Sequence, residues 1–305
     1  MQQNDRISEP SGILILNKPV GITSHDGVYK IRRLFGTKRV GHTGTLDPLA
    51  EGVLVMLIGK AARAAEYLAC DSKEYTATLR LGLTTDTEDV TGAVLTRSDA
   101  LPTEAEVQAV LDSFNGEIEQ IPPMYSALKV DGKKLYELAR EGKTVERQPR
   151  KITVFSLTAK ATGVPSDYIL NVACSSGTYI RTLCADIGKA LGCGGVMATL
   201  RRTAAGSFSI DGALTLEQLE EMTLDERISR LLPTESLFGD LPTVTLPDFY
   251  YRLCINGCEI YQKKIKTNQS VGERVRLCTP DNSFFALGEV REYADGTAIK
   301  AVKYF

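Results

Sequence analysis

The chain has 305 residues, of which 43% are hydrophobic, and a formal net charge of −2 at pH 7. This length allows one large domain or two, and the composition is that of an ordinary globular protein. The N-terminus lacks a charged-then-apolar targeting pattern and no apolar run is long enough to span a bilayer, so we expect a cytoplasmic protein that binds no membrane.

Cysteine and histidine usage narrows the possible chemistry. The seven cysteines are scattered, and Cys254 and Cys258 have no second pair of Cys or His to complete a zinc set. We therefore expect reduced, mostly buried thiols and no metal site. With only His25 and His42 available, a Ser-His-Asp hydrolase is also disfavoured. Carboxylates, tyrosines and arginines remain as candidate catalytic groups.

Charge is distributed unevenly along the chain. Residues 211–240 hold eight acidic residues and two arginines, whereas residues 29–39 hold five basic residues and no acid. Residues 129–151 hold eight basic and four acidic residues. Such basic stretches permit contacts with nucleic-acid phosphates, although a charge run is more often a solvated surface.

The N-terminal part predicts a strand followed by a helix. Residues 12–16 are apolar and lead into an Asn-Lys-Pro-Val-Gly turn. Ser24 is expected to be the N-cap of a helix that runs to Phe35 and stops at Gly36.

The stretch Gly41–Gly59 places Asp47 directly before Pro48 and ahead of an apolar run at 53–58. Proline disfavours the helical conformation for the preceding residue, so the carboxylate lies on a stiff bend that leads into a buried strand. An ionisable group on such a loop is a candidate catalytic residue. A tight polar turn between two elements is the alternative interpretation.

Residues 60–69 are expected to be helical, with Arg63 in the first turns. Residues 74–81 alternate as a strand whose apolar face begins at Tyr75, and the pattern alone indicates an ordinary tyrosine at the edge of the core. The carboxylates of the polar cluster 84–89 are either catalytic or engaged in turn hydrogen bonds.

The middle of the chain predicts a helix at 104–114, a stiff apolar loop at 121–127 and a basic helix at 133–140. Exposed apolar and aromatic groups beside lysines suit a surface that stacks on bases and contacts phosphates. Strands are expected at 151–161 and 168–174.

Residues 175–178 are expected to cap a helix at 179–191, with Arg181 in its first turn. The helix dipole disfavours a cation there, so this arginine either has an anionic partner or is exposed to solvent. A further strand is expected at 198–208.

The C-terminal part begins with an acidic helical region at 215–232, and prolines mark a domain boundary near residue 240. Alternating patterns at 273–278, 284–291 and 298–305 predict a small antiparallel meander that forms a compact barrel.

Six stretches, in order, resemble one known family. They read NKPVGITS, GHTGTLDPLAEGVL, KEYTATLRLGLTTDTEDVTG, IPPMYSALKVDGKKLYELAREG, SSGTYIRTLCADIGKALGCG and LRRTAAGSFS. Together they span nearly all of residues 12–210 and resemble the TruB family of tRNA pseudouridine-55 synthases, in its stand-alone bacterial form.

The resemblance implies an α+β pseudouridine synthase fold, with a mixed, mainly antiparallel sheet flanked by helices and a small C-terminal β-barrel. Residues 1–239 would form the catalytic domain, with a tRNA-binding insertion around 121–150. Residues 240–305 would form a PUA-like RNA-binding domain.

The implied reaction is isomerisation of uridine to pseudouridine at position 55 in the T loop of tRNA. Asp47 matches the family's catalytic aspartate, which acts as a nucleophile or as the base of a glycal route. Tyr75 matches the tyrosine that stacks on the flipped base, and Arg181 matches the arginine that pairs with the aspartate. Hydrolysis of a glycosidic bond usually employs two carboxylates, and no second acid is indicated beside Asp47.

The resemblance assigns further residues to substrate binding. Tyr179 and Leu200 match groups that line the uracil pocket, and His42 matches the residue that enters the space left by the flipped nucleotide. Support of the RNA backbone or of the catalytic loop is expected from Lys18, Arg63 and Lys129. The implied partner is the T stem-loop of tRNA, with no metal, no organic cofactor and no obligatory protein partner.

Two other functions are compatible with parts of the sequence. A tRNA-binding folding factor, in which modification is secondary, would tolerate the loss of Asp47. A carboxylate-dependent nucleoside hydrolase would have little use for the basic stretches or the C-terminal barrel. The complete set of Asp47, Tyr75 and Arg181 favours the synthase.

Overall fold

A computed structural model describes residues 9–67, 72–126, 128–130 and 132–305. Its main sheet has the strand order β1-β3-β12-β4-β11-β10-β7, with β2 paired to β3 and β13 paired to β12. Among the described strands of this sheet only the β3–β12 pair is parallel, so the sheet is mixed and mainly antiparallel, as predicted. The strands are β1 (Gly12–Lys18), β2 (Val40–His42), β3 (Ala50–Ile58), β4 (Ser72–Leu81), β7 (Gly116–Gln120), β10 (Arg150–Ala161), β11 (Asp167–Ser175), β12 (Gly195–Ala205) and β13 (Phe208–Ser209).

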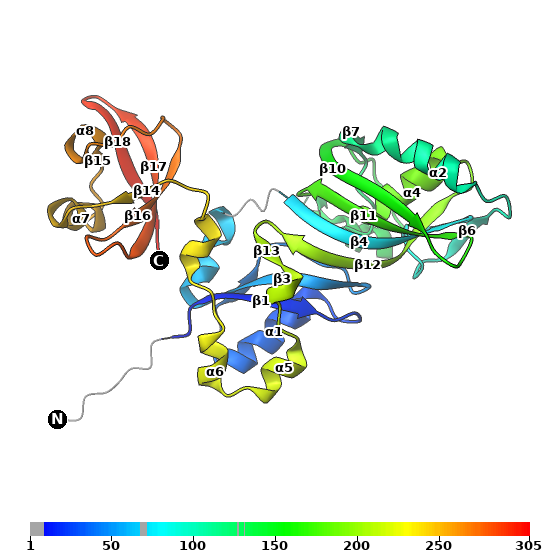
Figure 1. Cartoon of the computed structure of the whole chain (residues 1–305), viewed down its shortest axis with the longest axis horizontal. Coiled ribbons are helices and arrows are strands. Elements are labelled where there is room, and N and C mark those ends of the chain that lie inside the picture. The colour runs from blue at the N-terminus through cyan, green and yellow to red at the C-terminus, as the bar shows by residue number, and fades with distance from the viewer. Residues whose placement is uncertain (1–8, 68–71, 127, 131) are drawn as a thin grey trace.

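Helices close the main core of this sheet. Val28, Ile31 and Phe35 of α1 (Ser24–Phe35) pack in one cluster with the apolar side chains of β1, β3 and β4. The same cluster includes Val107 of α2 (Glu104–Leu111) and Leu183 of α4 (Ile180–Ala190). Figure 1 shows α1 beside β1 and β3, whereas α2 and α4 lie at the end of the sheet that contains β10 and β11. Two short helices, α5 (Leu216–Glu221) and α6 (Leu224–Ser229), follow β13 in the chain.

Strands β1 and β3 are buried on both faces. Their second face packs against Ala61 of the 3-10 helix η1 (Gly59–Tyr67) and against Phe208 of β13. A strand covered on both faces needs no alternation of apolar and polar residues. This explains why the apolar run at 53–58 is continuous, and the predicted strand there is confirmed within β3.

Several predicted boundaries need correction. The N-cap of α1 is Thr23, whose side chain forms a reciprocal capping box with Asp26, and not Ser24. The segment predicted as a helix from residue 60 is the 3-10 helix η1, and residues 68 and 69 lie outside the described part. No side chain of residues 175–178 caps α4; the amide of Gln120 instead bonds both backbone groups of Tyr179.

Short elements account for most of the remaining differences. The helix predicted at 104–114 divides into α2 and the 3-10 helix η2 (Asp112–Phe114), and the basic helix is the shorter α3 (Leu135–Arg140). The sequence patterns missed β2 and β7. They also missed two small hairpins, which consist of β5 (Leu83–Thr85), β6 (Val94–Arg97), β8 (Lys129–Val130) and β9 (Lys133–Lys134).

The C-terminal part forms a five-stranded half-barrel. Its strand order is β14-β16-β17-β18-β15, and within residues 243–304 no ladder joins β14 to β15, so the predicted compact barrel is present as a half-barrel. The three predicted strands are present, and α7 (Asp248–Ile255) and α8 (Gln262–Ile265) add Cys254 and Ile265 to its core. The strands are β14 (Thr243–Thr245), β15 (Ile260–Tyr261), β16 (Arg274–Cys278), β17 (Phe284–Tyr293) and β18 (Gly296–Tyr304).

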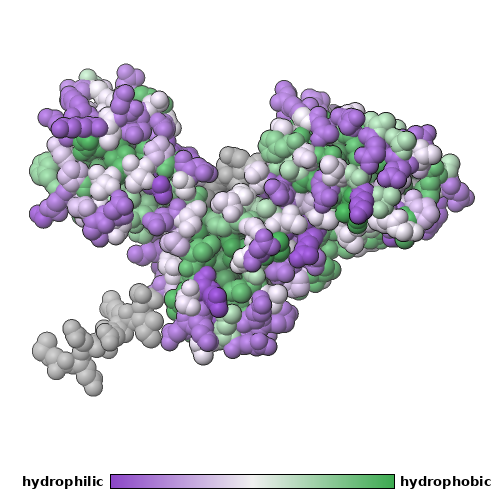
Figure 2. Space-filling view, in the orientation of Figure 1, coloured by the Kyte–Doolittle hydropathy of each residue, from purple (hydrophilic) through white to green (hydrophobic). Residues whose placement is uncertain are grey.

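An aromatic cluster joins the half-barrel to the rest of the chain. Phe238 of the 3-10 helix η4 (Thr234–Phe238) packs against Phe284 and Phe305, and Lys303 forms an ion pair with Glu66 of η1. Figure 1 shows the half-barrel connected to the main sheet through this narrow region. Hydrophilic residues cover most of both outer lobes in Figure 2, and a hydrophobic area lies over the middle of the molecule.

Two expectations from composition can be compared with the described residues. None of their helices has the length and hydropathy that a membrane crossing requires. The six described cysteines are free and all but Cys258 are buried, in agreement with the predicted thiols, while Cys70 lies outside the described part.

A side chain at Gly52 should destabilise the protein. The φ of Gly52 is 103°, in the left-handed region, and a Cβ there would overlap the carbonyl oxygen of Arg202. We expect Gly52→Ala to lower the free energy of unfolding by about 3 kcal/mol or more, measured by urea denaturation. Gly116 is a matched control, since its φ is 94° and a Cβ would meet no atom within 4 Å. Gly116→Ala should cost only about 1–2 kcal/mol. Equal losses in the two variants would contradict the steric explanation.

Candidate active site

Asp47 lies on the bend between β2 and β3, and hydrogen bonds fix this bend on both sides. The Ser24 hydroxyl accepts from the Leu46 amide at 2.7 Å and donates to the Leu46 carbonyl oxygen at 3.0 Å. The Gly21 amide donates to the Pro48 carbonyl oxygen at 2.8 Å. Since Thr23 already caps α1, the Ser24 side chain is available to hold the loop. The carboxylate is therefore presented by a bend with little freedom.

The Arg202 side chain also bonds the backbone of this loop, although the sequence patterns did not indicate it as a site residue. Its side chain is only 2% exposed and donates to the carbonyl oxygens of Val53 at 2.7 Å and Gly44 at 3.0 Å. A third, longer bond reaches the Thr45 carbonyl oxygen at 3.5 Å. The parallel pairing of β12 with β3 places this arginine next to the loop. The only sequence signal is its place in the Leu-Arg-Arg motif.

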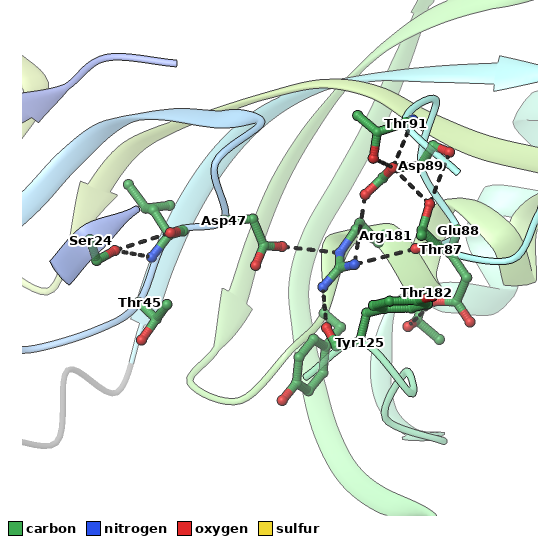
Figure 3. A network of polar contacts seen from close by, with 12 residues as sticks. Ser24, Thr45, Asp47, Thr87, Glu88, Asp89, Thr91, Tyr125, Arg181 and Thr182 are labelled. Carbon is green, nitrogen blue, oxygen red and sulfur yellow. Dashed lines mark hydrogen bonds and ion pairs between the residues drawn. The ribbon is translucent and has the colours of Figure 1, made fainter. Parts of the chain in front are cut away.

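Arg181 and Asp47 form the central ion pair of the site. The Arg181 Nε atom lies 3.0 Å from Oδ2 of Asp47 (Figure 3). The arginine side chain is 7% exposed and the aspartate side chain is 40% exposed. Arg181 also donates to the carbonyl oxygens of Thr87 at 3.3 Å and Tyr125 at 2.9 Å. Of the two sequence interpretations of Arg181, the structure supports the anionic partner and excludes exposure to solvent.

Asp89 is a second acid that contacts Arg181, although it does not lie beside Asp47. Its Oδ2 atom is 3.7 Å from Nη1 of Arg181, and it is buried. Its other oxygen accepts from the Thr87 hydroxyl at 2.8 Å and from the Thr91 amide at 2.9 Å. Figure 3 shows Asp47 and Asp89 on different sides of the guanidinium. Asp89 therefore forms the turn hydrogen bonds considered for the polar cluster and also contacts Arg181.

Lys18 is fully buried at the end of β1. Its ammonium donates to the carbonyl oxygens of Pro19 and Ile22, each at 2.8 Å. Burial lowers the pKa of Lys18 to about 8, and the negative charge of Asp47 opposes this shift. Lys18 therefore supports the turn that borders the loop carrying Asp47, and its charge lies within electrostatic reach of Asp47.

Three predicted pocket residues belong to β4, β12 and the start of α4, of which the last two also carry Arg202 and Arg181. Tyr75 is 7% exposed on β4, where it pairs in register with Arg202, and burial raises the pKa of its hydroxyl. Leu200 is buried on β12 and pairs with Ala77 of β4. Tyr179 is half-buried at the N-cap of α4, two residues before Arg181. Tyr75 is more enclosed than a tyrosine at a strand edge would be, because β4 extends beyond it to Ser72.

The remaining predicted residues lie in different environments. His42 ends β2, half-buried, and burial followed by the charge of Arg202 lowers its pKa. Its Nδ1 atom has no hydrogen-bond partner among the described residues. Arg63 is exposed on η1. The backbone of Lys129 belongs to β8, and its side chain lies outside the described part. Across the described residues no cluster of His, Cys, Asp and Glu could hold a metal ion.

Comparison with known proteins gives consistent matches. Residues 32–180 match the TruB family pseudouridylate synthase (N terminal domain), and residues 181–239 match the tRNA pseudouridylate synthase B C-terminal domain. The chain is 43% identical over 283 residues to "tRNA pseudouridine synthase B" of Burkholderia mallei (strain NCTC 10247), covering 92% of this chain and 93% of the relative. The protein of the same name from Clostridium kluyveri is 41% identical over 296 residues, covering 96% and 99%.

Among solved structures, the chain is similar to one in the "Crystal Structure of a Cbf5-Nop10-Gar1 Complex". The TM-score is 0.75 at 26% identity, and the match covers 99% of this chain and 87% of the other. The expected α+β fold agrees with this similarity.

Arg202 and Arg201 form a matched pair for mutation, because Arg201 is the exposed neighbour, 3.8 Å from Glu51. Lysine retains the charge but lacks the planar fork that bonds several carbonyl groups at once. We expect Arg202→Lys to lower the free energy of unfolding by about 2–4 kcal/mol and Arg201→Lys by less than about 0.5 kcal/mol, measured by urea denaturation. Similar small losses in both variants would show that Arg202 does not hold the loop.

The lowered pKa of Lys18 predicts a pH dependence of stability. Between pH 8 and the ordinary lysine value of 10.5, the unfolded chain binds the Lys18 proton more fully than the folded protein does. The stability of the parent relative to Lys18→Met should therefore rise as the pH increases from about 8 to about 10.5. Urea denaturation of both proteins across this range measures the difference. A difference that stays constant with pH would contradict the shifted pKa.

Proposed function

Because the chain belongs to the TruB family of pseudouridylate synthases and is an enzyme that isomerises uridine to pseudouridine, we propose that it modifies uridine 55 in the T loop of tRNA, with Asp47 as the essential carboxylate. The carrying observation is the Asp47–Arg181 pair, in which an accessible carboxylate is held by a buried cation. A substrate nucleotide can therefore reach the Asp47 carboxylate without displacing Arg181.

The proposed reaction breaks the bond between N1 of uracil and C1′ of ribose, turns the base, and joins C5 to C1′. The hydrogen lost from C5 is replaced by one at N1, so the atoms balance. Asp47 acts on the sugar, either by adding to C1′ or by removing a proton in a glycal route. Both routes use an ionised carboxylate, which also stabilises positive character at C1′.

Surrounding side chains receive the flipped nucleotide in this proposal. Tyr75 stacks on the base, and Leu200 and Tyr179 line the uracil pocket. His42 occupies the space that the nucleotide leaves. The lowered pKa of His42 favours its neutral imidazole, which suits stacking better than a charged ring would. Arg181 keeps Asp47 oriented toward the sugar.

We further propose a division of RNA binding along the chain. Residues 1–239 form the catalytic domain, with a tRNA-binding insertion around 121–150, and residues 240–305 form a PUA-like RNA-binding domain. The insertion reaches the site directly, since the Tyr125 carbonyl oxygen accepts from Arg181. The T stem-loop is the proposed partner, bound without a protein subunit.

Asp47→Asn tests the catalytic assignment. We expect it to abolish pseudouridine formation on a tRNA transcript, because the amide is neutral, while the Kd for tRNA stays within about tenfold of the parent. Mapping of pseudouridine in the treated tRNA and a filter-binding titration give the two measurements. Glu51→Gln, on β3 and 43% exposed, is the matched control and should remain active. Turnover by Asp47→Asn would contradict the assignment of Asp47 as the essential carboxylate.

A further inference from the structure

We propose that Glu88 is a positioning residue for Arg181, acting through a hydrogen bond to Thr182; this inference rests on the proposed role of the Asp47–Arg181 pair. The Thr182 hydroxyl donates to Oε2 of Glu88 at 2.6 Å. Thr182 follows Arg181 directly in α4, and Figure 3 shows Glu88 and Thr182 beside the guanidinium.

The position of Glu88 in its loop explains how this bond affects the site. Thr87 and Asp89, its two neighbours in the chain, provide the carbonyl oxygen and the carboxylate that contact Nη1 of Arg181. The bond to Thr182 therefore ties the loop to α4 at the residue next to Arg181. A loop held in this way keeps both acceptors in register with the guanidinium, whose Nε atom faces Asp47.

The backbone of Glu88 indicates that its side chain is used. Its φ is 64°, in the left-handed region that few residues other than glycine and asparagine adopt. Its carbonyl oxygen accepts from the Met197 amide at 3.0 Å, which fixes the loop against β12. A glycine would meet these backbone demands at lower cost, so the glutamate contributes through its carboxylate.

The surroundings of the carboxylate agree with a specific role. Glu88 is half-buried, and burial raises its pKa, while the Thr182 bond and the charge of Arg181 act in the opposite direction. Asp186 of α4 adds repulsion. A carboxylate in such a place is retained only if its hydrogen bond compensates for the lost hydration.

Four variants and a control test this inference by single-turnover rate and by Kd for tRNA. Glu88→Gly removes the side chain and suits the observed φ, so the loop should remain folded. Thr182→Val removes the donor. We expect each to slow the rate about tenfold, or ~1.4 kcal/mol, with Kd unchanged within about twofold. The double variant should be no slower than either single variant. Glu88→Gln, which still accepts a hydrogen bond, should restore most of the rate.

Asp186→Asn is the matched control, because it removes a nearby acid of α4 that bonds neither the loop nor Arg181, and it should keep the parental rate. Parental rates in Glu88→Gly or Thr182→Val, or losses that multiply to about a hundredfold in the double variant, would overturn the inference. The rates are read at whichever uridine the parent modifies. Failure of the proposed function would instead show as a parent that leaves uridine 55 unmodified.

Discussion

The ion pair between Asp47 and Arg181 is the constraint on which the site depends. It joins a loop of the N-terminal half to a helix more than a hundred residues later in the chain, so neither segment is complete alone. A buried arginine is costly unless charges and hydrogen-bond acceptors surround it. Asp89 and two carbonyl oxygens provide the further acceptors that surround the Arg181 guanidinium. Asp47 can therefore stay partly open to solvent while its partner is enclosed.

The parallel pairing of β3 with β12 is the second organising feature. It is parallel in a mainly antiparallel sheet, and it sets Arg202 opposite Gly52. The absence of a side chain at Gly52 lets the two backbones approach, and the Arg202 guanidinium then reaches carbonyl groups of β3 and of the loop that carries Asp47. A change at Gly52 or Arg202 would therefore act on the loop that carries Asp47.

Much of this arrangement could be predicted from local patterns, and the rest depends on distant contacts. The bend at Asp47 and the strands β3 and β4 follow from proline chemistry and periodicity, which act within a few residues. The pairing of Asp47 with Arg181 could be predicted only from the resemblance to the family. Arg202 was missed as a site residue because its partners lie far away in the chain, and local patterns could not choose between the two roles considered for the carboxylates of the cluster 84–89. Thr23 and Ser24 are equally good caps by type, and only the fold shows that Ser24 bonds Leu46.

The burial of the cations in this site has a consequence for a substrate that is itself a polyanion. Lys18, Arg181 and Arg202 are all nearly inaccessible to solvent, and each is satisfied by acceptors within the protein. An exposed arginine near the site would be drawn to the many phosphate groups of an RNA strand. Buried cations cannot contact these phosphates, so they keep their partners within the protein when the RNA approaches. The cations around Asp47 are thus held by the protein itself, while the carboxylate of Asp47, 40% exposed, remains accessible.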